Sequence, residues 1–393
     1  MTIENIKKMF VEKFGKSDKP LRVFKSPGRV NLIGEHTDYN SGLVFPAAIC
    51  LETTIVLRER DDKIIKLAAT DLDVIVEADI EKIEDYKDIP WGNYQLGVAS
   101  ELIKAGYDVS GCEMLYDDTV PHGGGLSSSA AIQVATAVAL GTLASEKAGK
   151  SGLDMVEMAL ISQKSEHNYI GVKCGIMDQF ASAMGKENHA VMLDCNTLEY
   201  KHVPLNLKNE SIVITNTNKK RSLITSKYNE RCEECAKAVE AFKTVMPEVK
   251  ALAEISPEEF EKNKSVIKDD IIRNRAEHVI YEHNRVKESV KVLSEGNVEK
   301  FGELMNDSHD SLRDLYEVTG EELDTLVSAA RKVDGCIGSR MTGAGFGGCT
   351  VSLVRNDAID KFKETVEKEY TEKIGYAPSF YVTGAADGGR EIK

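Results

Sequence analysis

A glycine- and serine-rich stretch of the sequence has the composition of an anion-binding loop. It reads VPHGGGLSSSAAIQVATAVAL from Val120 to Leu140 and stands between an expected strand and an expected helix. A loop that opens a helix directs free backbone N–H groups and the positive end of the helix dipole at one point. A P-loop would require a lysine after the glycines, and none is present. A turn in which Ser127 or Ser128 merely caps a core helix remains open for this loop alone.

A second stretch, SPGRVNLIGEHTDYNSG from Ser26 to Gly42, is too polar to form core. Its closely spaced donors and acceptors are Arg29, Glu35, His36, Asp38 and Asn40. Such a set suits the recognition of sugar hydroxyl groups. The spacing of Glu35, His36 and Asp38 matches no common zinc pattern, so a metal site is the minor interpretation. Helix capping through Thr37 or Asp38 also remains open.

Two further motifs are weaker indications of a binding site. GAGFGG, from Gly343 to Gly348, has the G-x-G-x-x-G form of dinucleotide-binding loops, but a strand, CTVSLV, follows it where those loops open a helix. We therefore expect a close backbone approach to a ligand or a neighbouring domain. Cys232 and Cys235 form a single C-x-x-C pair on an expected helix, which favours core cysteines over a zinc site.

The elements expected to position these motifs include both helices and strands. A strand beginning near Leu21 is broken at Pro27 and Gly28, and residues 43–79 are rich in β-branched residues, which predicts further strands. Residues 222–333 are mostly charged, with apolar positions at three-to-four spacing that predict helices. The remaining segments predict helices at 91–106, 128–149, 154–171 and 358–375, a short helix from about Gly175, and strands at 112–120, 189–195 and 379–385. The fold class is α+β.

Length and composition narrow the functional classes. The 393 residues are 42% hydrophobic and 29% charged, as in a globular protein of two or three domains. A net charge of −14 argues against a nucleic-acid partner. The first residues lack the apolar core of a signal peptide, no continuous apolar run approaches the roughly 18 residues of a membrane span, and the eight cysteines follow no disulfide-scaffold pattern. We expect a cytoplasmic protein with no membrane contact and no evident protein partner.

The three motifs together resemble those of the GHMP small-molecule kinases, and GRVNLIGEHTDYN resembles the hallmark of the galactokinase family. The similarity continues in order through CGIMDQF, SKYNERC, RAEHVIYEHNRV, LMNDSHDSL, RMTGAGFGGCT and PSFYVTGAADG. It implies a two-domain GHMP-kinase fold with the active site in the interdomain cleft. The N-terminal domain would span 1–205 and be completed by 376–393, and the C-terminal domain would span 206–375.

The resemblance also implies an activity, the transfer of phosphate from ATP to the anomeric hydroxyl of galactose, giving galactose 1-phosphate and ADP. Asp178 would be the general base or the group that orients this hydroxyl. Arg29 would hold that carboxylate ionised and stabilise charge on the moving phosphoryl group. The residues implied to bind the other sugar hydroxyls are Glu35, His36, Asp38, the backbone of Gly175, and Tyr228.

For the co-substrate, the resemblance implies an adenine pocket at Trp91 and Tyr94 and Mg²⁺ held by Ser129 and Glu166. The implied phosphate loop comprises Gly123, Gly124, Gly125, Ser127, Ser128 and Ser129. The chain departs from the family at Gln133, where the family usually has glutamate. We expect this position to lie behind the residues that touch the substrates, and activity to be retained.

Two alternative functions remain open. N-acetylgalactosamine could replace galactose as the sugar. A non-catalytic sensor that binds galactose and ATP is the alternative from another class. Sensors that have lost activity lack part of the Ser/Ala run, whereas GLSSSAA is complete here and both Arg29 and Asp178 are present.

Overall fold

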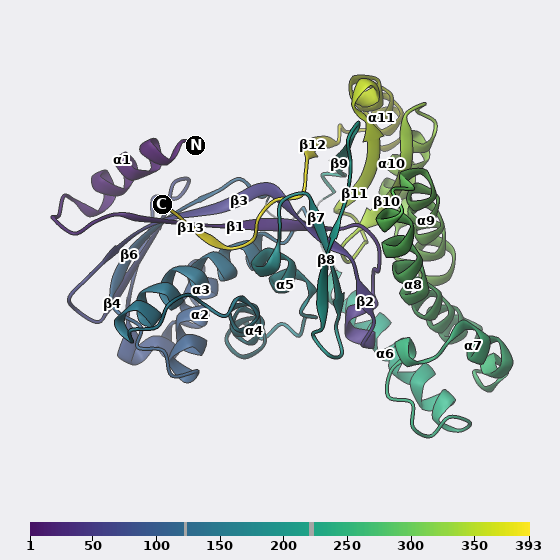
Figure 1. Cartoon of the computed structure of the whole chain (residues 1–393), viewed down its shortest axis with the longest axis horizontal. Helices are drawn as coiled ribbons and strands as arrows, with labels where there is room; N and C mark the ends of the chain where they lie inside the picture. Colours follow the sequence, from purple (N-terminus) through teal and green to yellow (C-terminus); the bar gives the residue numbers. More distant parts are fainter. Residues whose placement is uncertain (122–123, 220–223) are drawn as a thin grey trace.

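The computed structural model describes residues 1–121, 124–219 and 224–393. Its strands form three sheets: a six-stranded sheet of order β13-β1-β3-β6-β4-β5, a four-stranded sheet of order β10-β11-β9-β12, and a three-stranded sheet of order β2-β7-β8. Two lobes result, with the six-stranded sheet in one and the four-stranded sheet in the other (Figure 1). The strand pairs are antiparallel except for β4 with β6, and helices pack against the sheets, as in the predicted α+β class.

The element bounds are as follows. The strands are β1 (Arg22–Asn31), β2 (Leu43–Val44), β3 (Pro46–Glu59), β4 (Ile64–Ala69), β5 (Ile75–Asp79), β6 (Cys112–Asp118), β7 (His189–Asp194), β8 (Tyr200–Pro204), β9 (Glu210–Asn216), β10 (Cys336–Thr342), β11 (Cys349–Arg355), β12 (Ser379–Thr383) and β13 (Arg390–Ile392). The helices are α1 (Ile3–Phe14), α2 (Asn93–Lys104), α3 (Ser128–Lys147), α4 (Met155–Ser165), α5 (Met177–Met184), α6 (Ile224–Lys243), α7 (Pro257–Asn263), α8 (Asp270–Ser294), α9 (Val298–Ser311), α10 (Gly320–Arg331) and α11 (Ile359–Ile374).

The six-stranded sheet is covered on both faces. Successive side chains of a strand point to opposite faces, so Val23 of β1 packs with Phe10 of α1, whereas Phe24 joins the core beneath α2, α3, α4 and α5. Figure 1 shows α1 above this sheet and the other four helices below it. The sheet is therefore a buried layer whose strand ends, and the loops after them, are free to carry polar groups.

The expected break in the first strand is wrong. β1 continues through Pro27 and Gly28 and pairs with β3 on both sides of them, with a shift of register between Pro27 and Arg29. A bulge inserts a residue without ending a strand. Proline is tolerated where a ladder hydrogen bond is already interrupted. The bulge also lets β1 lie close to the glycine-rich loop, because a Cβ at Gly28 would meet the carbonyl oxygen of Leu126 at 2.6 Å.

Helix α3 is a core helix. Among the described residues, it is the one helix whose length and composition would allow it to cross a membrane, and 78% of that apolar window is buried inside the protein. Its alanines and valines pack under the six-stranded sheet together with α2 and α4. The glycine- and serine-rich loop is thus attached to a rigid, buried element.

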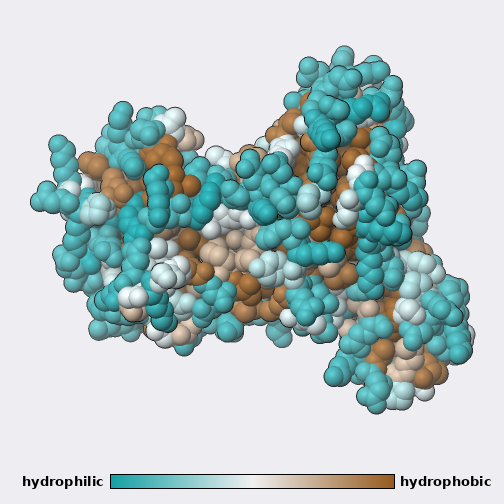
Figure 2. Space-filling view, in the orientation of Figure 1, coloured by the Kyte–Doolittle hydropathy of each residue, from teal (hydrophilic) through white to brown (hydrophobic). Residues whose placement is uncertain are grey.

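The two lobes share one hydrophobic cluster. Val30 and Phe45 of the first lobe contact the same core as Ile212 of β9, Val286 of α8 and Phe301 of α9. The other face of the four-stranded sheet packs against α10 and α11. Figure 2 shows apolar residues at the waist between the lobes, while hydrophilic residues cover most of the outer surface in this view. The lobes are held together by core packing, which fixes the geometry of any site between them.

The domain limits drawn from the sequence, 1–205 with 376–393 and 206–375, stay a prediction. The chain does return to the first sheet at its end, because β13 pairs with β1. Strand β12 pairs with β9 in the other sheet. A division that followed the sheets would therefore assign residues up to Thr383 to the second lobe.

A buried carboxylate joins the second lobe to the polar stretch of the first. Glu282 of α8 is fully buried and accepts hydrogen bonds from the backbone N–H groups of Gly34 (2.8 Å) and Glu35 (3.2 Å). It also accepts from the Ser308 hydroxyl at 2.7 Å and pairs with Arg285 at 2.7 Å. Burial acts to raise the pKa of Glu282, but the charge of Arg285 and its other partners lower it to about 2. The ionised form is therefore built into the fold.

Replacing Glu282 with Gln should lower the free energy of unfolding by about 3 kcal/mol at neutral pH, because the partly buried Arg285 loses its charged partner. A carboxylate with a lowered pKa stabilises the fold above its usual pKa of 4.5 and loses that effect as the pH falls towards 2. Urea unfolding at pH 7 and at about pH 3 should therefore show a smaller difference between the proteins at the lower pH.

Glu303→Gln is the matched control. Glu303 pairs with Lys300 on the surface of α9, and its side chain is 64% exposed. Its replacement should change the free energy of unfolding by less than about 0.5 kcal/mol. An equal loss in both variants would contradict the role given to Glu282.

Candidate active site

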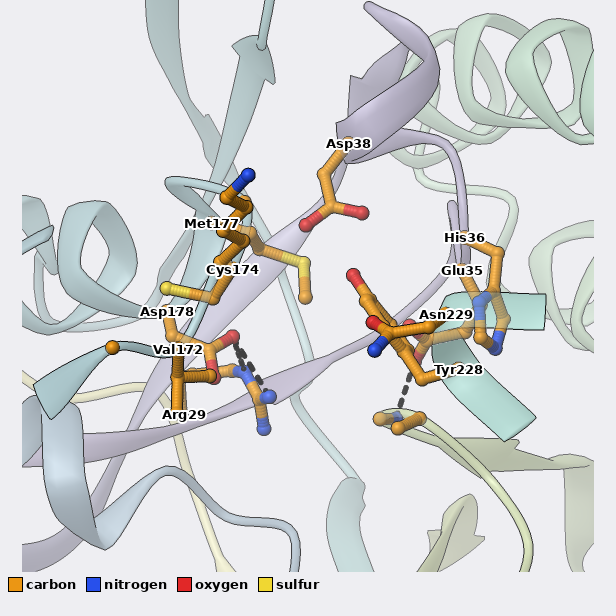
Figure 3. Close-up of a pocket in the computed structure, with 15 residues that line it drawn as sticks. Arg29, Glu35, His36, Asp38, Val172, Cys174, Met177, Asp178, Tyr228 and Asn229 are labelled. Carbon is orange, nitrogen blue, oxygen red and sulfur yellow. Dashed lines mark hydrogen bonds and ion pairs between the residues drawn. The ribbon is translucent and has the colours of Figure 1, made fainter. Parts of the chain in front are cut away.

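A cavity of about 400 Å³ lies where the two lobes meet, and it brings together all seven residues predicted to act on or bind the sugar. They are Arg29, Glu35, His36, Asp38, Gly175, Asp178 and Tyr228. Figure 3 shows Arg29 and Asp178 on one side of this space, Glu35, His36 and Tyr228 on the other, and Asp38 directed into it from above. Residues far apart in sequence thus converge on one volume, as a ligand site requires.

Arg29 and Asp178 form an ion pair at one wall of the cavity. The Nε and Nη2 atoms of Arg29 each lie 2.8 Å from Oδ1 of Asp178, and the Arg29 side chain is 5% exposed. Nη1 of Arg29 donates to the carbonyl oxygen of Gly125 at 2.7 Å. Asp178 is in the first turn of α5, where a carboxylate also interacts favourably with the helix dipole. The guanidinium therefore lies between the cavity and the glycine-rich loop.

Glu35 is held by the second lobe. Its carboxylate is buried, and Oε1 accepts from the backbone N–H of Gly343 at 2.8 Å and from Arg340 at 3.3 Å. Gly343 opens the GAGFGG loop, and a Cβ there would stand 3.4 Å from the carbonyl oxygen of Gly125. The expectation that this loop closely approaches a neighbouring part of the molecule is confirmed.

Asp38 and Gly175 are in direct contact. A Cβ on Gly175 would lie 1.9 Å from Oδ2 of Asp38, so the requirement for glycine comes from the carboxylate beside it. Burial raises the pKa of Asp38 to about 7, and the charges of Asp178 and Glu35 contribute. Three carboxyl groups thus face one small cavity, which favours a ligand that donates hydrogen bonds.

His36 and Tyr228 form part of an aromatic wall. The ring centroids of His36 and Tyr228 are 5.9 Å apart, and Nδ1 of His36 is 2.8 Å from the Tyr39 hydroxyl. His36 has a φ of 62°, an unusual conformation for a non-glycine residue. Burial lowers the pKa of His36 to about 3, so the ring is neutral at physiological pH. The side chain can therefore take part in hydrogen bonding without adding charge.

The glycine- and serine-rich loop opens α3, as predicted. Ser127 occupies the N-cap position with a φ of 59°, but its side chain makes no capping bond and instead donates to Oδ2 of Asp178 at 2.5 Å. Ser128 and Ser129 begin the helix, and Gly124 and Gly125 precede it. The predicted phosphate residue Gly123 lies outside the described residues. Because the capping side chain is turned away, the loop is more than a capped turn, and the first-turn N–H groups of α3 remain for another acceptor.

The two predicted adenine residues do not line this cavity. Trp91 precedes α2 and is half-buried against the core of the first lobe, with its ring 6.5 Å from that of Tyr116. Tyr94, in the first turn of α2, has a pKa raised by burial and by the charge of Glu166. Tyr94 therefore lies on the same side of the first lobe as the predicted metal residue, and its role in nucleotide binding stays a prediction.

Glu166 lies beside two buried glutamines, one of which follows Ser129 in α3 by one helical turn. Gln133, one helical turn after Ser129, accepts from Nε2 of Gln179 at 3.2 Å, and the same Nε2 lies 3.3 Å from Oε2 of Glu166. Glu166 is 7% exposed, and burial raises its pKa to about 7. No group of three or more His, Cys, Asp or Glu that could hold a metal occurs in the part of the chain that is described. Gln133 is fully buried, and its place behind the residues that touch the substrates stays a prediction.

The sequence did not indicate several residues that build the site. Arg340 is fully buried beside Glu35, and Glu282 anchors the backbone of the same motif. Cys174 lines the cavity, and its carbonyl oxygen accepts from Gln163 at 3.2 Å and contacts Nε2 of His167 at 2.8 Å. A charged residue within the apolar strand before GAGFGG was the one signal that pointed to Arg340.

Two family models define the class of protein. The GHMP kinases N terminal domain matches residues 93–186, and the GHMP kinases C terminal domain matches residues 289–372. The fold is also that of the solved Methanococcus jannaschii mevalonate kinase, with a TM-score of 0.68 and 20% identity over 94% of this chain and all of that one. The two-lobed architecture is therefore the GHMP kinase fold.

More specific similarities concern the polar stretch and the whole chain. The galactokinase galactose-binding signature matches residues 8–59. The chain is 48% identical to the galactokinase of Clostridium tetani over 392 residues, covering 100% of this chain and 98% of that protein. The solved structure of Lactococcus lactis galactokinase complexed with galactose matches with a TM-score of 0.94 and 43% identity, covering 100% of both chains. The chain belongs to the galactokinase family.

The contact between Gly175 and Asp38 can be tested by Gly175→Ala. The new Cβ would force the Asp38 carboxylate out of its position, while the rest of the fold has no need to move. Because misplacement by about 1 Å can cost roughly a hundredfold in a preorganised site, we expect the galactose KM to rise at least tenfold. The melting temperature should change little. Steady-state kinetics and thermal unfolding measure the two effects.

Gly384→Ala is the control for this substitution, because nothing lies within 4 Å of a Cβ built there. It should leave both KM and melting temperature unchanged. A Gly175→Ala protein with normal galactose KM would show that the position of Asp38 does not matter.

Proposed function

We propose that the protein transfers the γ-phosphoryl group of ATP to the anomeric hydroxyl of galactose, giving galactose 1-phosphate and ADP. The observation that supports this most directly is the Arg29–Asp178 ion pair. It lies in the wall of the sugar-sized cavity, and Arg29 also bonds to the glycine-rich loop at Gly125. An acceptor for the hydroxyl proton and a cation for the moving phosphoryl group are therefore adjacent.

In this proposal Asp178 accepts the proton of the anomeric hydroxyl, or orients that hydroxyl, as its oxygen attacks the γ-phosphorus atom. Arg29 stabilises the negative charge that spreads over the phosphoryl oxygens. The phosphates are bound by the loop of Gly123, Gly124, Gly125, Ser127, Ser128 and Ser129, with adenine near Trp91 and Tyr94. The other sugar hydroxyls are bound by Glu35, His36, Asp38, Gly175 and Tyr228. Most of the catalytic effect then comes from positioning and charge.

Glu166 and Ser129 would hold Mg²⁺. The fit rests on Glu166, a buried carboxylate that has hydrogen-bond partners but no cationic partner in the described residues. Mg²⁺ commonly takes one or two carboxylates together with substrate phosphates and water, and a Ser–Glu pair suits that mode. When bound, the ion neutralises charge on the nucleotide phosphates.

The alternatives are less well supported. A sensor would not require the Arg29–Asp178 pair to lie between sugar cavity and phosphate loop. N-acetylgalactosamine is less well supported because a galactose-binding signature matches this chain and the similar solved structure is a galactokinase with galactose bound. Galactose is therefore the preferred sugar.

The deciding experiment is ADP release by the purified protein with Mg-ATP and galactose, N-acetylgalactosamine, glucose or no sugar. Release only with galactose is expected. Asp178→Asn should lower kcat by roughly 10²–10⁴, because the amide cannot accept the proton, while galactose binding measured by calorimetry persists. Wild-type turnover in that variant would remove Asp178 from the mechanism. Galactose binding without ADP release in the native protein would favour the sensor.

Galactose affinity should depend on pH through Asp38. Its pKa of about 7 means that the carboxylate, the better acceptor, is mostly present at pH 8 and mostly protonated at pH 6. If the protonated form binds poorly, the affinity for galactose should fall up to about tenfold between those values. The pH dependence of galactose affinity is measured by calorimetry with galactose and no Mg-ATP. Metal and nucleotide binding at the proposed site of Glu166 then do not enter the measurement. Equal affinity at both pH values would contradict the assignment.

Asp38→Asn is the control. It should bind galactose weakly with little pH dependence over this range. A carboxyl whose pKa is raised from 3.8 to about 7 on folding also destabilises the folded protein increasingly as the pH rises. The Asn variant should therefore have a higher melting temperature than the native protein at pH 8, and this gain should disappear near pH 4.

A further inference from the structure

A chain of hydrogen bonds runs from the second lobe to the sugar cavity. Sγ of Cys235, on α6, lies 3.1 Å from the hydroxyl of Tyr316, which ends a short helical turn (Leu312–Tyr316) after α9. The Tyr316 hydroxyl lies 2.7 Å from that of Tyr39, and the latter is 2.8 Å from Nδ1 of His36. We call these four groups the Cys235–His36 chain. Cys235, Tyr316 and His36 are buried, and the proposed mechanism uses only His36.

Either group of the Cys235–Tyr316 bond can donate, and Asn40 favours donation by the Cys235 thiol. The side-chain amide of Asn40 donates to the carbonyl oxygen of His36 at 2.9 Å and to Sγ of Cys235 at 3.6 Å. A thiol carries one proton and its sulfur also accepts. With Asn40 donating to the sulfur, the thiol proton is available to Tyr316. The Tyr316 hydroxyl then donates to Tyr39, and Tyr39 donates to Nδ1 of His36.

The environment of His36 agrees with this direction. Burial keeps the ring neutral, with a pKa of about 3, and a neutral imidazole carries a proton on only one of its two nitrogens. Nδ1 accepts from Tyr39 in this arrangement, which leaves Nε2 as the protonated nitrogen. Nε2 is buried and has no hydrogen-bond partner in the described part of the chain, and His36 lines the cavity, so this N–H remains for a ligand.

We propose that the Cys235–His36 chain fixes His36 as the neutral tautomer with its proton on Nε2, so that the residue presents a hydrogen-bond donor to an oxygen atom of the sugar. Tyr39, Tyr316 and Cys235 are then positioning residues for sugar recognition. Among three carboxyl groups that accept, His36 supplies a donor without a charge. The sugar part of this inference rests on the proposed function, whereas the tautomer does not.

The tautomer can be measured directly by long-range ¹H–¹⁵N correlation on protein labelled with ¹⁵N-histidine, without sugar or ATP. His36→Gln identifies the His36 signals by their disappearance. We expect Nδ1 to have the shift of an unprotonated ring nitrogen and Nε2 that of a protonated one. A proton on Nδ1, or a charged ring at neutral pH, would overturn the inference. A failure of the proposed function would be visible separately, as absence of ADP release.

The effect of the Cys235–His36 chain on galactose recognition is tested by variants that remove one of its hydrogen-bond donors. Cys235→Ala and Tyr316→Phe remove a donor and should weaken galactose binding roughly two- to tenfold, the usual effect of one hydrogen bond, with the KM for ATP unchanged. Cys235→Ser keeps a donating hydroxyl and should restore the native affinity. If Cys235→Ala fails to fold, Tyr316→Phe and Cys235→Ser still decide the question.

Cys232→Ala is the matched control. Cys232 lies on the same helix, one turn before Cys235, and is only partly buried. It takes no part in the Cys235–His36 chain, so galactose affinity and the His36 signals should not change. Equal losses in the Cys232 and Cys235 variants would mean that α6 packing, and not the hydrogen-bond chain, controls sugar binding. Unchanged affinity and tautomer in both Cys235→Ala and Tyr316→Phe would also overturn the inference.

Discussion

The ion pair between Arg29 and Asp178 is the interaction on which the geometry of the site depends. Arg29 is on β1, Asp178 is in the first turn of α5, and the guanidinium also bonds to the loop before α3 at Gly125. Hydrogen bonds of 2.7–2.8 Å from this one guanidinium thereby fix three elements of the first lobe relative to one another. A largely buried guanidinium needs all of its donors satisfied, so each partner restricts the others.

The second lobe contributes through buried charge as well as through apolar packing. Arg340 and Gly343 hold the Glu35 carboxylate, and Glu282 holds the backbone before it. Such contacts tolerate little displacement, because separating Glu35 from Arg340 and Gly343 would leave its carboxylate buried without a partner. The shared hydrophobic cluster supplies the attraction between the lobes, and these polar contacts determine how they are aligned.

Much of the fold, and the residues that meet at the cavity, could be predicted from the sequence. The α+β class and the loop that opens α3 were predicted, and the seven residues assigned to the sugar from the family resemblance all line one cavity. The bulge at Pro27 was not predicted. A proline followed by glycine usually ends a strand, and only the pairing of β1 with β3 shows that this strand continues. Arg340, Glu282 and Tyr316 were missed for a different reason. Their positions follow from how the lobes pack, and the local sequence gives one trace of them, the charge of Arg340 in the strand before GAGFGG.

The charges around the cavity restrict the kind of ligand that fits. Glu35 is balanced by Arg340 and Asp178 by Arg29, but Asp38 has no cationic partner among the residues that the structure describes. Its pKa is raised by burial and by the other two carboxyl groups. A ligand carboxylate would add to this repulsion, and an apolar ligand would leave the acceptors unpaired. A neutral polyol relieves both problems, because its hydroxyl groups donate to the carboxylates and bring no charge. The raised pKa of Asp38 is the energetic consequence of keeping that acceptor ready before the sugar arrives.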